Sequence, residues 1–328
     1  NIIPFYYVYK TLIPIFYCVF RCIFVFDTAS CQLSADDVLL GEGRTTCVYS
    51  ACKGNKFRAT GCHNYSLLIY FFRLLRRFSV FLHQIAYFVD MKFSEVIGQD
   101  DAKERLRQMV AENRVPHAIM LCGPQGCGKM ALALAFASYL LCENNSGDDC
   151  CGSCRQCVMT DKLAHPDLHF SYPVIRPSGT GSEHKMSSED FTGEWRHLLS
   201  QGPYFTMDQW LAAMGAANQQ AQMGVGESDV VMRALSLKSS QGGYKVCIIW
   251  LPERMNAECA NKMLKIIEEP PHKTVFIMVC EEPEKLLDTI RSRAQRIDIK
   301  RIETESIETA LVDRRGIDAD AARRIARA

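Results

Sequence analysis

The sequence has almost no imbalance of charge. Its 328 residues carry 38 Lys and Arg against 37 Asp and Glu, a formal net charge of +1. No basic stripe stands out from residue 91 onward, where acidic residues slightly outnumber basic ones. The composition therefore does not indicate a partner held by strong overall electrostatic attraction, although it is compatible with a local charged patch.

Residues 1–90 lack the regular patterning of the rest of the chain and do not begin with Met. A membrane helix needs about 20 predominantly apolar residues. The first aromatic stretch is interrupted by Lys10 and Arg21, and the second carries three arginines in its middle. We therefore interpret 1–90 as a non-native upstream translation, with the true start at Met91. A membrane anchor and a disordered extension are the alternatives.

From Met91 onward, short apolar runs alternate with amphipathic segments. Strands are expected at 117–122, 168–175, 244–251, 274–280 and 294–299. Helices are expected at 100–113, 129–142, 227–239, 256–271 and 283–293. This alternation predicts an α/β domain with a parallel sheet over 91–300. We interpret 176–226 as an insertion with one or two short helices and a surface loop. The purely helical pattern of 301–328 indicates the start of a second domain.

The stretch GPQGCGKM, residues 123–130, follows a predicted strand and precedes a predicted helix. In a phosphate loop, backbone N–H groups cradle phosphate and a lysine neutralises charge. Gly123, Gly126, Gly128 and Lys129 are the candidate binding residues. Met130 stands where a Mg²⁺-binding hydroxyl is expected, and a thioether is a poor ligand for Mg²⁺. A glycine-rich turn with only a structural role is the alternative.

A cysteine cluster follows the predicted helix. Cys142, Cys151, Cys154 and Cys157 have the spacing C-x8-C-x2-C-x2-C, which suits a tetrahedral structural Zn²⁺ site in a module at 142–157. Cys150 is a substitute for Cys151 if the loop shifts by one residue. Free thiols and an iron–sulfur cluster are the alternatives. One such cluster plus isolated thiols is typical of a reducing cytoplasm, which is the expected location.

The phosphate loop, the cysteine cluster, the stretch AHPDLH, the segment NKMLKIIEEPP and the tripeptide Ser292-Arg293-Ala294 together resemble the bacterial DNA polymerase III clamp-loader family. The resemblance covers roughly Phe93–Ile299. It implies a RecA-like AAA+ P-loop fold with an inserted zinc module, followed by the start of a small α-helical lid domain. It also implies that the partners are the gamma/tau and delta subunits, primer-template DNA and, indirectly, the sliding clamp. It implies no association with a membrane.

Within the family, motor subunits end one strand in Asp-Glu, which holds Mg²⁺ and orients the attacking water. This chain has Trp250 and Leu251 at the matching places, and Glu253 lies two positions too far along. Together with Met130, these residues predict that the chain does not hydrolyse ATP. Weak ATP binding stays compatible with Lys129, whereas Mg²⁺ binding is not expected. The resemblance is therefore to the delta-prime type of subunit.

Arg293 is the candidate catalytic residue. The resemblance implies that this arginine enters the ATP site of a neighbouring subunit as an arginine finger, where a guanidinium stabilises transition-state charge. A solvated arginine at a helix end is the alternative. Two other functions stay open: an ATP-hydrolysing gamma/tau-type motor subunit, and a membrane-anchored AAA+ protein if residues 1–90 are native.

Overall fold

The computed structural model describes residues 92–145, 147–175, 185–216, 219–239 and 243–327. The interpretation of residues 1–90 lies outside these ranges, as does segment 176–184 of the predicted insertion.

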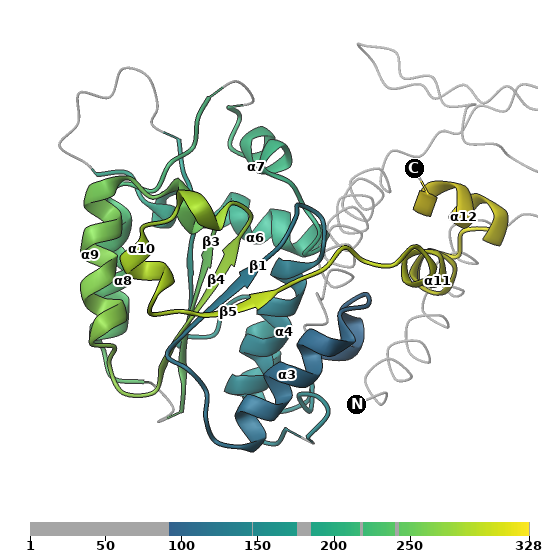
Figure 1. The fold of residues 1–328 in the computed structure, drawn as a ribbon, viewed down its shortest axis with the longest axis horizontal. Coiled ribbons are helices and arrows are strands. Elements are labelled where there is room, and N and C mark those ends of the chain that lie inside the picture. The colour runs from purple at the N-terminus through teal and green to yellow at the C-terminus, as the bar shows by residue number, and fades with distance from the viewer. Residues whose placement is uncertain (1–91, 146, 176–184, 217–218, 240–242, 328) are drawn as a thin grey trace, which may run out of the picture. The chain divides into compact units, whose positions relative to one another are not determined.

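A five-stranded sheet forms the centre of the described part, and every neighbouring pair of its strands is parallel. The order across the sheet is β2-β3-β4-β1-β5 (Figure 1). The strands are β1 (Ala118–Cys122), β2 (Leu168–Ser171), β3 (Lys245–Trp250), β4 (Thr274–Cys280) and β5 (Gln295–Asp298). The predicted α/β class with a parallel sheet is therefore confirmed.

Helices cover both faces of the sheet (Figure 1). One face packs with α3 (Asp100–Ala111), α4 (Lys129–Leu141), α6 (Thr192–Gln201) and α7 (Met207–Ala213). The other packs with α8 (Val225–Ser236), α9 (Ala257–Glu268) and α10 (Asp288–Arg291). The remaining elements are α5 (Arg155–Asp161), α11 (Thr304–Arg315), α12 (Ala319–Arg327) and four 3₁₀ turns, η1 (Phe93–Glu95), η2 (Ser188–Phe191), η3 (Pro252–Arg254) and η4 (Pro283–Lys285).

The central strands are apolar except for Lys245 and Thr274, which begin β3 and β4, because both of their faces are buried. Successive side chains of a strand point to opposite faces. Ile119 and Leu121 of β1 accordingly join the core on the α4 side, whereas Met120 and Cys122 join the core on the α9 side. The short apolar runs in the sequence are therefore the buried strands of a three-layer domain.

Most predicted elements begin or end within three residues of those observed, and two differ by more. The strand expected at 168–175 ends at Ser171, two residues before Pro173, which has no N–H to donate to a ladder. The helix expected at 283–293 is two short pieces, because the backbone is extended at the buried Leu286. The helix expected from Glu227 begins at Val225.

The predicted insertion contributes an aromatic cluster to the core. Trp195 of α6 stacks on Tyr172 with ring centroids 4.0 Å apart, and it lies 5.2 Å from Trp210 of α7. Trp195 also lies 5.4 Å from Trp250, the last residue of β3. One or two short helices are expected in this segment, and two are present, α6 and α7. Their packing fixes the segment on the end of β3.

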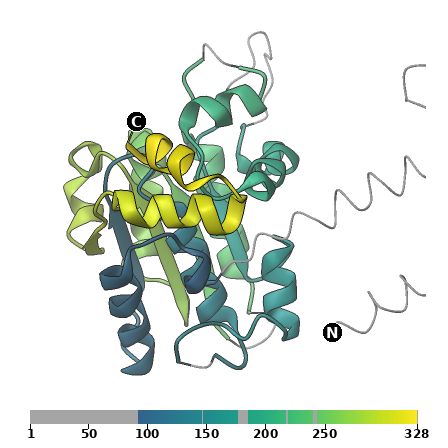
Figure 2. The ribbon, with the colours of Figure 1, turned by 90° about the vertical axis from the view of Figure 1, so that its right-hand side faces the viewer.

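The C-terminal helices α11 and α12 lie side by side (Figure 2). Arg314 of α11 donates to the backbone carbonyls of Glu95 at 2.5 Å and Ser94 at 3.2 Å. Its guanidinium also pairs with the Glu95 carboxylate at 3.2 Å. One arginine therefore ties α11 to the η1 turn at the beginning of the described chain.

Candidate functional site

The glycine loop lies where the sequence predicts it, between the end of β1 and the first residue of α4. Gly126 and Gly128 have positive φ values of 79° and 85°. L-residues with a Cβ rarely adopt this conformation, so these two glycines are required by the turn itself. The loop has the local form of a phosphate loop.

Gly123 has a different role, which is close packing. A Cβ atom placed on it would lie 2.3 Å from the carbonyl oxygen of Ile299, just beyond β5. Ile299 in turn donates its N–H to the carbonyl of Cys122 at 2.6 Å. The glycine therefore lets β1 and the segment after β5 approach each other at the loop entrance.

Lys129 is buried, and its ammonium group is bound within the loop. Its Nζ donates to the carbonyls of Gly123 at 2.8 Å and Pro124 at 2.5 Å. It also lies 3.7 Å from a carboxylate oxygen of Glu281, the residue that follows β4. Burial raises the pKa of Glu281, and the nearby Lys129 partly offsets that rise. A phosphate group would have to compete with these internal partners for the lysine.

The three positions that would serve Mg²⁺ and water are apolar and enclosed. Met130, Trp250 and Leu251 are 5%, 4% and 2% exposed, and all belong to the core on the α4 side. Trp250 packs on Phe205 with centroids 5.0 Å apart. None of these three side chains offers an oxygen ligand for a divalent cation.

Glu253 lies in η3, just after β3, and its carboxylate is engaged with the segment that follows β4. Its Oε1 accepts from the N–H groups of Glu281 at 2.9 Å and Glu282 at 3.2 Å. Its Oε2 is buried and has no hydrogen-bond partner among the described residues. The side chain therefore joins the ends of β3 and β4.

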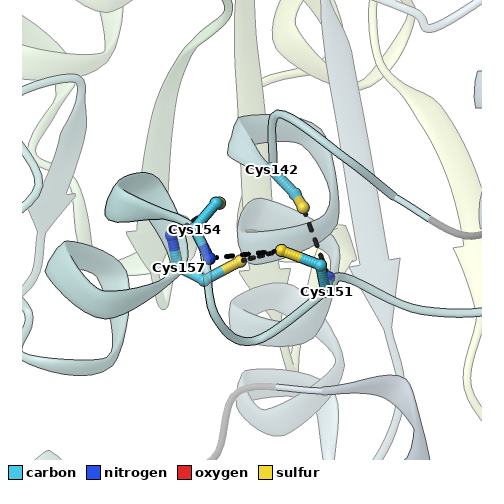
Figure 3. A group of neighbouring side chains, drawn as sticks. All are labelled: Cys142, Cys151, Cys154 and Cys157. Atoms are coloured by element: carbon cyan, nitrogen blue, oxygen red, sulfur yellow. Dashed lines mark hydrogen bonds between the residues drawn. The ribbon is translucent and has the colours of Figure 1, made fainter. Parts of the chain in front are cut away.

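The four predicted cysteines converge at the end of α4 and the start of α5 (Figure 3). Their sulfur atoms all lie within 4.8 Å of one another. A tetrahedral zinc–thiolate centre with Zn–S bonds of about 2.3 Å places sulfurs about 3.8 Å apart. The observed Cys151–Cys157 separation of 4.0 Å fits this geometry. The cluster can hold a metal ion, and it contains Cys151 rather than Cys150.

Backbone N–H groups point at three of the sulfurs. Cys151 N–H donates to Cys142 Sγ at 3.3 Å, Cys154 N–H to Cys151 Sγ at 3.3 Å, and Cys157 N–H to Cys154 Sγ at 3.4 Å. Hydrogen bonds of this kind favour thiolates. The N–H groups of Ser153 and Cys154 lower the pKa of Cys151 to about 6, whereas burial raises the pKa of Cys142 to about 12.

Arg293 follows α10 and is 38% exposed at its side chain. One of its nitrogens lies 2.7 Å from the carboxylate of Glu268, the last residue of α9, and another donates to the carbonyl of Thr289 at 2.8 Å. The predicted arginine is therefore at the surface and held in place. Arg293 is not one of the residues of the glycine loop, which spans 123–130.

Sequence reasoning missed two residues at these places. Glu268 was part of the segment that carried the resemblance, but nothing in that segment indicated its pairing with Arg293. Tyr204, from the predicted insertion, lies against Gly128. Because it is 76 positions away along the chain, no local pattern could have revealed this contact.

Residues 98–303 match the family model described as DNA polymerase III, delta subunit. The chain belongs to this family. Its relatives include DNA polymerase III subunit delta' of Pseudomonas aeruginosa, 30% identical over 54% of this chain and 41% of the relative. Subunit delta' of Bacillus subtilis is 26% identical over 63% of this chain and 49% of the relative. Subunit tau of the same species is 27% identical over 67% of this chain and 31% of the relative. The chain is thus of the delta-prime type within this family, and it spans less than half the length of these relatives.

Two Thermotoga maritima structures are also similar. A DNA polymerase III gamma subunit-related protein is 16% identical, with a TM-score of 0.37 over 68% of this chain and 57% of that one. The RuvB Holliday junction branch migration motor is 14% identical, with a TM-score of 0.36 over 73% and 59%. Among the residues that the structure describes, no helix has the length and hydropathy needed to cross a bilayer.

Proposed function

We propose that this delta-prime-type subunit does not hydrolyse ATP itself and donates Arg293 to the ATP site of a neighbouring clamp-loader subunit. The observation that carries the first half is the enclosure of Met130, Trp250 and Leu251 in the apolar core. Phosphoryl transfer depends on Mg²⁺ and on a positioned water. A site built from a thioether, an indole and an isobutyl group supplies neither.

The second half is supported by the position of Arg293. Its guanidinium is at the surface, and its contacts with Glu268 and Thr289 limit the conformations it can adopt. A pre-ordered guanidinium loses less entropy when it engages phosphate oxygens. Arginine fingers supplied in trans accelerate phosphoryl transfer by about 10³–10⁵-fold.

In this proposal the chain works with gamma/tau and delta subunits to load the sliding clamp onto primer-template DNA. The four cysteines, Cys142, Cys151, Cys154 and Cys157, would hold a structural Zn²⁺. Such an ion has four protein ligands and no open position, so it would stabilise the fold and take no part in hydrolysis.

The experiment has two arms. The isolated full-length chain is assayed for ATP turnover with Mg²⁺, and no turnover above buffer is expected. The chain is then assembled with its partner subunits and clamp, and loader ATPase is compared for wild type, Arg293→Ala and Arg296→Ala. Arg296 is the matched control because it is an exposed arginine of the same segment, paired with Asp298 at 2.7 Å.

Loss of loader ATPase with Arg293→Ala but not with Arg296→Ala is the expected result. Brisk turnover by the isolated chain would instead favour a gamma/tau-type motor. Equal loader activity of all three proteins would leave Arg293 without the proposed role.

A further inference from the structure

Tyr204 covers the residue at which the glycine loop joins α4. A Cβ atom placed on Gly128 would lie 3.2 Å from the ring atom Cε1 of Tyr204 and 3.7 Å from its hydroxyl oxygen. The same point is 3.8 Å from Cδ1 of Ile302. Two side chains from distant parts of the chain therefore contact one glycine of the loop.

The hydroxyl of Tyr204 also forms a hydrogen bond with the backbone of a neighbouring segment. It accepts from the N–H of Ile97 at 2.9 Å. Ile97 belongs to the segment that leads into α3, and Gln99 of that segment donates to the loop carbonyl of Cys127 at 3.0 Å. The tyrosine thus bridges the glycine loop and the segment beside it.

The backbone around Tyr204 is held on its C-terminal side. Phe205 packs on Trp250, at 5.0 Å between centroids, so it is anchored in the aromatic cluster. Thr206 caps α7, accepting from Gln209 N–H at 3.3 Å, while the Gln209 side chain accepts from Thr206 N–H at 2.9 Å. Two anchored neighbours hold the ring in position over the loop.

We infer that Tyr204 is the residue that excludes nucleotides from this loop. A nucleotide whose phosphates lie on the glycine loop must extend its sugar and base past that loop. The Tyr204 ring, which lies against Gly128, fills the space beside the loop. Its hydroxyl occupies the N–H of Ile97, so that backbone donor is not available to a ligand. A nucleotide can bind only to the fraction of molecules in which the tyrosine has moved, which weakens its apparent affinity by that fraction.

This inference concerns binding, whereas the proposed function rests on the missing hydrolysis. Met130, Trp250 and Leu251 deprive the site of Mg²⁺ and water, but a phosphate loop without a magnesium ligand still offers N–H groups to phosphate. The two ideas can therefore fail independently.

The test is a titration of the full-length chain with fluorescent MANT-ADP, for wild type, Tyr204→Ala and Tyr204→Phe. Tyr204→Ala is expected to bind at least about tenfold more tightly than wild type, a difference of about 1.4 kcal/mol. Tyr204→Phe keeps the ring and loses only the hydroxyl, so its affinity is expected to stay within about threefold of wild type. Pyrophosphate in excess should displace the nucleotide from Tyr204→Ala, which locates binding at the phosphate loop.

Equal dissociation constants for wild type and Tyr204→Ala, with melting temperatures that agree, would overturn the inference. If Tyr204→Ala does not fold, Tyr204→Leu keeps an apolar contact with Gly128 but is shorter and lacks the hydroxyl, and it should show the same tightening. ATP turnover by the tightened variant would contradict the proposed function and leave the inference intact. Binding without turnover supports both.

Discussion

The guanidinium of Arg293 lies 2.7 Å from the carboxylate of Glu268, and each side chain is 38% exposed. Ion pairs exposed to this extent contribute about 0–1 kcal/mol to stability, because water screens the charges. Arg293→Ala should therefore lower the free energy of unfolding by less than about 1 kcal/mol. Urea denaturation followed by circular dichroism measures this change. A loss well above that range would mean that any effect of the variant on loader ATPase reflects folding rather than catalysis.

The cysteine cluster predicts a metal-dependent stability that distinguishes two nearby cysteines, Cys150 and Cys154. Cys154→Ser should abolish stoichiometric zinc and lower the free energy of unfolding by about 3 kcal/mol, or about 6–12 °C in melting temperature. Cys150→Ser should keep the zinc, because Cys150 lies outside the group of four converging thiols. Metal analysis of the purified variants and thermal melts provide the readouts. If Cys150→Ser lost its zinc while Cys154→Ser kept it, Cys150 would be a ligand and the proposed set of four would be wrong.

The two loop glycines Gly123 and Gly126 should differ in their tolerance of alanine. Gly126 has a φ of 79° and open space around it, so Gly126→Ala should cost about 1–2 kcal/mol of backbone strain. Gly123→Ala would place a Cβ 2.3 Å from the Ile299 carbonyl, and forcing two backbone segments apart should cost about 3 kcal/mol or more. Chemical denaturation of both variants tests the order. The reverse order would mean that the loop is constrained by its turn rather than by the approach of Ile299.

Glu227 of α8 should make stability fall as pH rises. It is 1% exposed and accepts from the N–H and hydroxyl of Ser188 at 2.7 and 2.8 Å. Burial raises its pKa above the ordinary value of 4.5. The folded state therefore favours the neutral acid, and the stability present below pH 4.5 is lost as pH rises through the folded pKa.

Glu227→Gln should flatten this dependence, by up to about 1.4 kcal/mol for each unit by which the two pKa values differ. Urea titrations between about pH 4 and 8 compare it with wild type and with Glu258→Gln, an exposed carboxyl on α9. Parallel curves for wild type and Glu227→Gln would show that this carboxyl does not couple folding to pH.

The sequence predicted the sheet and the cysteine cluster well because their signals are local. A buried parallel strand such as β4 is an unbroken apolar run after its first residue, Thr274, and its expected limits, 274–280, are those observed. The helix expected from Asn256 is present as α9, and the Asn256 side chain caps it by accepting from Cys259 N–H at 2.8 Å. The cysteine spacings likewise lie within one short excursion of the chain.

The remaining features depend on contacts between distant segments. Trp195 and Trp210 lie in a stretch without a clear period, and their burial depends on Tyr172, just after β2, and on Trp250 at the end of β3. The pairing of Arg293 with Glu268 and the contact of Tyr204 with Gly128 are likewise set by the tertiary fold. No pattern within a helix or strand encodes such partners.

All three tryptophans of the chain lie in the single aromatic cluster at the end of β3. Indoles this close exchange excitation, so their ultraviolet emission and near-ultraviolet dichroism report on one place only. Detachment of α6 and α7 from the sheet would change that signal, while movement of α11 and α12, which contain no tryptophan, would leave it almost unaltered. The protein thus carries its own spectroscopic probe of whether this segment is docked.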